Sequence, residues 1–244
     1  MTTTLNDAWQ TLVPPAGDRH GPLQPLLLVL TIVTGLVDAF SYLVLGHVFV
    51  ANMTGNVVFL AFALVGARGF SIAASALALG AFALGAVASG RFVVHLGPRR
   101  GRMLAVSTGC EAVLVATAVA VGWAAAQPGS GAARYVLILL LGTAAGMQNG
   151  TARKLAVPDL TTTVLTLTIT GAAFDSRLAG GPNSRIGRRG LSAAAMFVGA
   201  LAGAFVVLHV AKPLGLLVAL VLLVPVAVAA GRLSRARPAW DRPD

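Results

Sequence analysis

The stretch Gly35-Leu36-Val37-Asp38 decides the fold, because the similar stretch Gly146-Met147-Gln148-Asn149 follows it 111 positions later. Residues 51–56, Ala-Asn-Met-Thr-Gly-Asn, come soon after the first stretch. Residues 161–166, Thr-Thr-Thr-Val-Leu-Thr, come after the second, with a slip of one or two positions. Two longer hydrophobic segments follow each copy. The sequence therefore predicts two related halves of about 111 residues.

The composition is that of a membrane protein. Hydrophobic residues make up 57% of the 244 residues and charged residues only 11%, against roughly 25% charged residues in a soluble domain. Six apolar runs approach or exceed the ~20 residues that a helix needs to cross a bilayer. These runs are 25–45, 70–94, 103–126, 135–157, 191–210 and 214–230. None of them alternates as the strands of a membrane barrel do, so we expect an all-α fold, a polytopic helical membrane bundle.

The chain divides into one membrane domain and two tails. We expect the domain to cover residues 24–232, with repeat halves at about 24–126 and 134–232. Residues 1–23 are polar and lack a basic start leading into a short apolar core, so we expect a loose tail and not a cleaved signal peptide. Residues 233–244 form a basic C-terminal tail.

Two further segments, 50–67 and 160–174, are shorter and more polar, and the positions of the basic residues bear on whether they span. If both dip in and return on the same side, six segments span and only Arg68, Arg134 and Lys212 of the 18 basic residues fall outside. If all eight segments span with the N-terminus inside, seven basic residues fall outside. Positively charged loops stay cytoplasmic, so six spans plus two re-entrant or half-helical segments fit better.

This topology predicts how the halves are oriented. Three spans plus a re-entrant segment cross the membrane an odd number of times, so the second half is inverted relative to the first. That is a common plan among secondary transporters, whose substrates bind between the halves. We expect a multi-pass protein of the bacterial inner (plasma) membrane with both termini cytoplasmic. Eight spans with parallel repeats remain the alternative.

Polar residues inside the apolar segments are the candidate site. Asp38 lies well inside the first span, where an ionisable group costs roughly 2.5–3.5 kcal/mol on insertion scales. It either carries a coupling proton or cation, or holds a neighbouring helix by a hydrogen bond. The remaining residues expected to line a substrate or ion pathway are Asn52, Thr54, Asn56, Gln148, Asn149, Thr163 and Thr166.

Several of these residues also have a plain structural interpretation. A helix starting near Thr54 would direct free N–H groups toward an anion or carboxylate, but Thr54 or Asn52 also suits an ordinary N-cap. The threonine-rich segment lines a polar path, or its hydroxyls bond back to their own helix.

Glu111 is the other buried acid. Arg91 and Glu111 are each ten residues from Gly101, in the turn between the third and fourth segments. In a helical hairpin both would lie about 15 Å from that turn, at 1.5 Å per residue. We therefore predict a structural ion pair between them.

Other function classes are disfavoured. The net charge of +10 lies mostly beside hydrophobic segments, as an orientation signal requires, and does not indicate nucleic-acid binding. We find no nucleotide motif, no nucleophile elbow and no metal-ligand spacing, so we expect no enzyme, no metal and no cofactor. The expected partners are the lipid bilayer, anionic headgroups at the basic cytoplasmic loops and an unknown small solute or ion. A homo-oligomer is left open.

Four motifs together resemble a known family. Residues 35–42 (Gly-Leu-Val-Asp-Ala-Phe-Ser-Tyr), 49–56 (Phe-Val-Ala-Asn-Met-Thr-Gly-Asn), 146–150 (Gly-Met-Gln-Asn-Gly) and 162–166 (Thr-Thr-Val-Leu-Thr) resemble the YoaK-like family of bacterial membrane proteins, built on a domain of unknown function. The resemblance covers about residues 24–232. It implies a multi-pass inner-membrane protein and supplies no reaction.

The leading functional prediction is a secondary transporter or permease of unknown substrate, with a polar site between the two halves. The alternative is a non-transporting membrane protein with an assembly, sensing or lipid-associated role. The two differ at Asp38: a cavity that reaches this residue favours transport, and a closed bundle in which it is fully paired favours the alternative.

Overall fold

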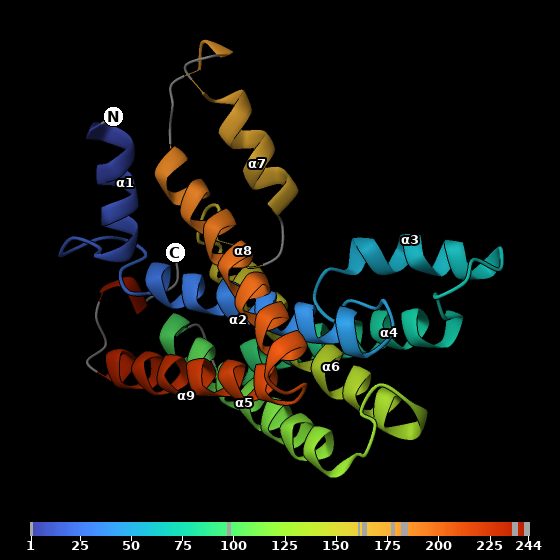
Figure 1. Cartoon of the computed structure of the whole chain (residues 1–244). Coiled ribbons are helices and arrows are strands. Elements are labelled where there is room, and N and C mark those ends of the chain that lie inside the picture. The colour runs from blue at the N-terminus through green and yellow to red at the C-terminus, as the bar shows by residue number, and fades with distance from the viewer. Residues whose placement is uncertain are drawn as a thin grey trace.

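The computed structural model describes residues 2–96, 99–160, 162, 165–176, 179–181, 185–235 and 239–241 (Figure 1). In these residues all regular structure is helical, which confirms the expected all-α bundle. The helices are α1 Thr2–Leu12, α2 Leu23–Val44, α3 Met53–Leu64, α4 Ile72–Leu96, α5 Arg100–Ala124, α6 Gly131–Leu155, α7 Leu165–Phe174, α8 Ile186–His209, α9 Leu214–Arg235 and the short 3₁₀ helix η2 Ala239–Asp241.

Six of the described helices, α2, α4, α5, α6, α8 and α9, are long and apolar enough to cross a membrane. A helix is the expected form for these runs because it satisfies every internal backbone group without help from water. In α2, 67% of the most apolar stretch is buried, against 28% in α8. The first span of the chain is therefore the central one, and α8 has much of its surface available to lipid.

The two halves are interlocked. By position in the repeat, α2 corresponds to α6, α4 to α8 and α5 to α9. The main contacts run between halves: α2 packs on α8, α4 packs on α6, and α5 packs on α9. In Figure 1, α8 (orange) crosses α2 (blue). Each half therefore buries its apolar faces largely against the other half and has little core of its own.

Glycines make these crossings close, and they do so equivalently in both halves. A Cβ added at Gly35 would lie 2.5 Å from the carbonyl oxygen of Met196, and one added at Gly146 would lie 2.0 Å from that of Phe82. Gly35 and Gly146 are the repeated glycines, and Phe82 and Met196 occupy matching places in α4 and α8. Glycine therefore stands at matching positions of the two halves because the helices cross in a pseudo-twofold arrangement. At each crossing, only glycine lets the two backbones approach.

Contacts at one end of the bundle join the starts of α2, α5 and α8 to the ends of α6 and α9. Arg100 donates to the carbonyl oxygens of Arg19 at 3.1 Å and Leu155 at 2.7 Å. Arg188 donates to the side chain of Gln24 at 2.7 Å. We call this the arginine end; the chain also passes from α4 to α5 here.

The opposite end, which we call the far end, holds the end of α2 and the starts of α4 and α6. Arg134 donates to the carbonyl oxygen of Gly46 at 3.4 Å. Nδ1 of His47 lies 3.0 Å from the carbonyl oxygen of Gly69, just before α4. The six long helices therefore alternate in direction between two ends, as the six-span prediction requires.

The segment between α2 and α4 enters and leaves at the far end. After α2 ends at Val44, the backbone N–H groups of Val50 and Ala51 donate to Asp38, six residues back along α2. That is a return of about 9 Å along the helix, at 1.5 Å per residue. Helix α3 then leads out again to the loop at Gly69. The predicted segment 50–67 therefore enters and leaves the bundle at the same end, as a re-entrant segment would.

The two ends of the segment containing α7 both lie at the arginine end. Asp159, just after α6, accepts a hydrogen bond from Arg189 at the start of α8 at 3.0 Å. Asp175, just after α7, accepts one from the same guanidinium at 2.6 Å. Both ends of the segment are thus held at the start of α8. Helix α7 covers part of the predicted segment 160–174.

The expectation of a loose N-terminal tail is wrong for residues 2–12. These residues form α1, which packs on α8. The carboxylate of Asp7 accepts a hydrogen bond from the backbone N–H of Arg188 at 2.9 Å. The close approach is possible because a Cβ at Gly187 would lie 2.3 Å from the carbonyl oxygen of Thr4. The helix is held by α8, which is distant in the sequence, so residues 1–23 alone do not predict it.

The C-terminal tail also folds back in its described part. Asp241 is buried and accepts hydrogen bonds from the backbone N–H of Gly101 at 2.6 Å and the hydroxyl of Ser234 at 2.9 Å. Its carboxylate thus sits at the start of α5, where free N–H groups favour a negative charge. Asp241 therefore ties the end of the chain to the arginine end.

Candidate functional site

Asp38 organises the turn that precedes α3. Its Oδ1 accepts hydrogen bonds from the backbone N–H groups of Val50 at 3.0 Å and Ala51 at 2.9 Å. Its Oδ2 accepts one from Nδ2 of Asn52 at 2.5 Å. The side chain is 3% exposed. This arrangement matches the structural interpretation of Asp38, in which the carboxyl holds a neighbouring segment.

Asn56 anchors the same turn from its other side. Its Oδ1 accepts a hydrogen bond from the backbone N–H of Phe49 at 2.9 Å, and its Nδ2 donates to the carbonyl oxygen of Phe49 at 2.5 Å. The amide therefore pairs with the backbone as a neighbouring peptide would. A Cβ at Gly55 would lie 2.8 Å from the ring of Phe49, so glycine is needed there. The Asn-Met-Thr-Gly-Asn motif is explained by this turn.

The turn carries non-helical backbone at the depth of Asp38 in the bundle. Backbone of this kind needs partners for its N–H and C=O groups wherever water is excluded. Asp38 and Asn56 supply partners to Phe49, Val50 and Ala51. Sequence reasoning found these residues correctly as a buried polar set, and the structure places them at a turn.

Gln148 joins the first spans of the two halves. Its Nε2 donates to Oγ1 of Thr34 at 2.7 Å and to the carbonyl oxygen of Leu30 at 3.4 Å. Gln148 and Thr34 are both buried. This contact lies between α2 and α6, which is the interface where a site between the halves was predicted.

A small cavity borders this contact. It lies between α2, α5, α6 and the turn before α3, and its walls include Thr34, Ala51, Glu111 and Gln148. The volume that the centre of a water molecule can occupy is about 10 Å³. This is room for about one water molecule. Asp38 does not line the cavity, but Ala51, which Asp38 binds, does. The turn therefore forms one wall of a mainly apolar cavity that Thr34, Glu111 and Gln148 also line.

Glu111 is the acidic group of this cavity, and the predicted ion pair with Arg91 is wrong. Glu111 is 3% exposed, and its Oε2 has no hydrogen-bond partner among the described residues. Arg91 is exposed to the surroundings of the bundle. The prediction assumed that α4 and α5 pack face to face, whereas α4 packs mainly on α6, and α5 on α6 and α9.

Two hydroxyls continue the polar contacts toward the arginine end. Thr151 donates to Oγ of Ser107 at 2.7 Å, and Ser107 donates to the carbonyl oxygen of Met147 at 3.4 Å. Ser107 precedes Glu111 by one helical turn, and Thr151 follows Gln148 by about one turn. Sequence reasoning missed Ser107 and Thr151. The signal was present: polar residues three or four positions apart share a helix face.

The other predicted site residues lie elsewhere. Asn149 is half-buried, and its Nδ2 donates to the carbonyl oxygen of Ala145 in its own helix at 2.9 Å. Thr54 and Thr166 are exposed at the starts of α3 and α7. Thr163 lies outside the described residues. The structure thus groups Asp38, Asn52 and Asn56 at the turn and places Gln148 at the cavity.

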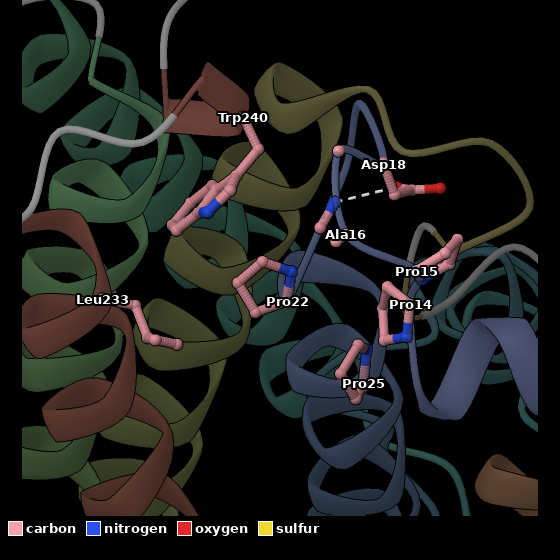
Figure 2. Close-up of a pocket in the computed structure, with 10 residues that line it drawn as sticks. Pro14, Pro15, Ala16, Asp18, Pro22, Pro25, Leu233 and Trp240 are labelled. Atoms are coloured by element: carbon pink, nitrogen blue, oxygen red, sulfur yellow. Dashed lines mark hydrogen bonds between the residues drawn. The ribbon is translucent and has the colours of Figure 1, made fainter.

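A larger pocket lies at the arginine end (Figure 2). It measures about 410 Å³ and is apolar, with walls that include Pro22, Leu233 and Trp240. Its acid, Asp18, is already bonded to the backbone N–H of Gly21 at 2.8 Å. Burial raises the pKa of Asp18, but hydrogen bonds from His20, Gly21 and Gln24 outweigh it and hold the pKa below its ordinary value. Among the described residues that line the pocket, Asp18 is the charged one, and its Oδ1 is already engaged.

Within the described residues, no group of three or more His, Cys, Asp or Glu side chains could hold a metal ion. The polar chemistry of the bundle interior is thus carried by single carboxyls, amides and hydroxyls. Such groups bind protons, water or a small polar solute.

Comparison with known proteins agrees with the sequence motifs. The chain is similar to the UPF0700 transmembrane protein YoaK of Bacillus subtilis (strain 168), with 32% identity over 155 residues. The aligned part is 62% of this chain and 65% of that protein, so it spans less than two thirds of the relative's length. No solved structure matches the chain.

The family match covers most of the membrane domain. Residues 26–229 match the family described as a protein of unknown function, DUF1275. This range takes in both repeat halves, the turn held by Asp38 and the cavity with Glu111. The chain therefore belongs to the DUF1275 family of YoaK-like, multi-pass transmembrane proteins.

Proposed function

We propose that this protein is a secondary transporter or permease whose site lies between α2, α5 and α6. The observation that carries the proposal is the buried Glu111 carboxyl, whose Oε2 has no hydrogen-bond partner among the described residues and which lines a small cavity where the two halves meet. A charged or ionisable group inside a membrane bundle is costly and marks an ion or substrate pathway by default.

The architecture supports the same conclusion. Inverted halves with interrupted, re-entrant segments are a recurring plan in secondary transporters, where one half moves against the other around a fixed midplane site. Here each half packs largely on its counterpart, so a shift of one half changes the interface at Thr34 and Gln148. The cavity would open when that interface moves.

Two barriers would then alternate. Toward the far end, the turn containing Ala51 closes the cavity, and Asp38 holds that turn. Toward the arginine end, the contact between Ser107 and Thr151 lies across the path. In this scheme Asp38 positions a gate and is no longer the coupling residue.

The charge distribution orients the molecule. Most of the arginines flank the arginine end, and Arg68, Arg134 and Lys212 flank the far end. Because positively charged loops stay cytoplasmic, the arginine end and both termini would face the cytoplasm of a bacterial cell, with the protein in the inner membrane. Anionic headgroups on that side would be its lipid partners.

Cysteine accessibility tests the proposal. In a Cys110→Ala background, Ala51→Cys and Thr151→Cys place single thiols at the two barriers. An alternating transporter lets a small, membrane-impermeant thiol reagent reach Ala51→Cys from the far side and Thr151→Cys from the arginine side. Exposed positions Arg68 and Arg235 at the two ends provide cysteine controls for reagent access.

The same experiment addresses the second candidate, a non-transporting membrane protein. The observation in its favour is that the cavity is small, at about 10 Å³, and that Asp38 has three hydrogen-bond donors. A static bundle predicts that both barrier thiols stay unreactive from either side while both control thiols react. That outcome removes the transport proposal.

A further inference from the structure

We propose that Glu111 carries a single proton in this transporter, exchanging it through one water molecule in the central cavity and the Ser107–Thr151 hydroxyl pair. The proposal rests on the proposed function and names its coupling ion. It concerns the acid that sequence reasoning treated as structural and assigns to it the role first considered for Asp38.

Oε2 of Glu111 has no hydrogen-bond donor among the described residues to stabilise a negative charge. The side chain is 3% exposed. An ionised carboxylate in such a place costs several kcal/mol unless it is paired. A bound proton removes that cost. In contrast, Asp38 has donors for both of its oxygens.

The surroundings bring no other charge to the cavity. The remaining side chains that line it, from α2, α5, α6 and the turn before α3, are all neutral. On α2, Asp38 is turned to the backbone of residues 50 and 51. On α4, which also touches α5, Arg91 is exposed; on α9, Arg232 and Arg235 lie at the arginine end. Glu111 is therefore the titratable group of this space.

The size of the cavity selects a proton over a metal cation. About 10 Å³ admits roughly one water molecule. Hard cations need six or more oxygen ligands, and the polar side chains lining the cavity are only Thr34, Glu111 and Gln148. Since Nε2 of Gln148 is engaged by Thr34, its side-chain oxygen is the atom left to accept from a water.

The hydroxyls provide a route to the arginine end. Ser107 and Thr151 are buried and bonded to each other at 2.7 Å, one helical turn from Glu111 and Gln148. A hydroxyl both donates and accepts, so it passes a proton on by rotation. In the release step the O–H bond of Glu111 breaks and the water takes that proton while giving one of its own to the hydroxyl pair. The pair in turn gives a hydroxyl proton to water at the arginine end, so Glu111 is left as a carboxylate and the water and both hydroxyls are neutral again. The reverse sequence reloads the carboxyl.

Infrared difference spectroscopy on the full chain in lipid vesicles tests for the proton directly. We expect a carboxylic C=O band that disappears at high pH, shifts in D₂O and is absent in Glu111→Gln. Glutamine replaces a protonated glutamate in shape and charge, so the variant should keep its thermal stability. Asp38→Asn is the matched control and should retain the band.

Proton uptake into the same vesicles, followed with a lumenal pH dye, tests for transport. We expect Glu111→Gln to lose uptake to the level of empty vesicles and Thr151→Val to slow it while keeping the infrared band. The absence of a Glu111 band at every pH overturns the proton assignment. Loss of the band on adding Na⁺ at constant pH assigns the site to a metal cation and also overturns it. A Glu111 band without uptake in any vesicle overturns the transport function instead, and unchanged uptake in Thr151→Val overturns the hydroxyl route.

Discussion

At the scale of single residues, two buried acids of this bundle have opposite environments. Asp38 accepts three hydrogen bonds, two from backbone N–H groups and one from an amide, whereas Oε2 of Glu111 accepts none from the described residues. A hydrogen bond to a charged group contributes about 1.5–3 kcal/mol. Asp38 is therefore an organiser of structure, and Glu111 is the residue whose environment needs another explanation.

Asp38→Asn should destabilise the turn before α3. The amide keeps one oxygen for Val50 and Ala51 but turns its NH₂ toward Nδ2 of Asn52, so two donors face each other. We expect a loss of about 1–3 kcal/mol in unfolding free energy, seen as a lower melting temperature in lipid or detergent.

The exchange variant Asp38→Asn with Asn52→Asp should recover part of that stability, because the amide at position 38 then donates to a carboxylate at position 52. Thr54→Ala is the control, since Thr54 is exposed at the start of the same helix. If the exchange variant is no more stable than Asp38→Asn, the contact with Asn52 is not what holds the turn.

At the scale of helices, the same short segment is held differently in the two halves. In the first half, Asp38 and Asn56 hold the turn before α3. In the second half, Asn149 stands at the position of Asp38 and bonds to its own helix, while Arg189 holds the segment through Asp159 and Asp175. Each half therefore supplies its own polar contacts to its short segment.

Glycine spacing on α4 should matter at one position only. A Cβ at Gly85 would lie 2.0 Å from the carbonyl oxygen of Thr143 on α6, whereas one at Gly80 meets nothing within 4 Å. We expect Gly85→Ala to cost about 1–3 kcal/mol by overpacking. Gly80→Ala should be neutral or stabilising by up to ~1 kcal/mol, because alanine favours the helix.

Melting temperatures of the two variants, measured side by side, check this prediction. Each variant adds one methyl group to the same helix. A difference between their melting temperatures therefore reports the α4–α6 contact and not helix propensity. Equal stabilities would contradict the close crossing. A gain in Gly85→Ala would do so more strongly.

At the scale of the whole molecule, the two halves form one folding unit. Because α2 packs on α8 and α4 on α6, the first half alone leaves its central helix without its main partner. The starts of α2, α5 and α8 share the arginine end, and the loops before α4 and α6 share the far end. This places the two re-entrant segments at opposite ends of the bundle.

Sided labelling should report opposite sides for Arg68→Cys and Arg235→Cys in a Cys110→Ala background. Both positions are exposed, and they lie at the far end and the arginine end. An impermeant thiol reagent added to intact cells should label only the first, and inverted vesicles should expose the second. Labelling of both from one side would indicate eight spans and parallel halves.

The sequence by itself determined the membrane class, the all-α fold and the six helices long and apolar enough to span, and it predicted the repeat and the re-entrant segments. Hydropathy and the placement of basic residues are local properties of a chain. Hydropathy predicts which segments cross the bilayer, and the basic residues predict which loops face the cytoplasm. The sequence also singled out Asp38, Asn56 and Gln148, which are buried, and Asn52, which is partly buried, because polar groups are rare inside apolar runs.

Only the tertiary structure decided what these residues do. Whether an acid is paired depends on which helices pack, and the assumed contact between α4 and α5 gave Glu111 the wrong partner. The interlocked packing instead placed Glu111 and Gln148 at one cavity and left Oε2 of Glu111 without a hydrogen bond from any residue that the structure describes. A hydrogen-bond partner that comes from a distant part of the chain cannot be recognised in the local composition. Only the packing therefore distinguishes Asp38, which organises the turn, from Glu111, the candidate proton carrier.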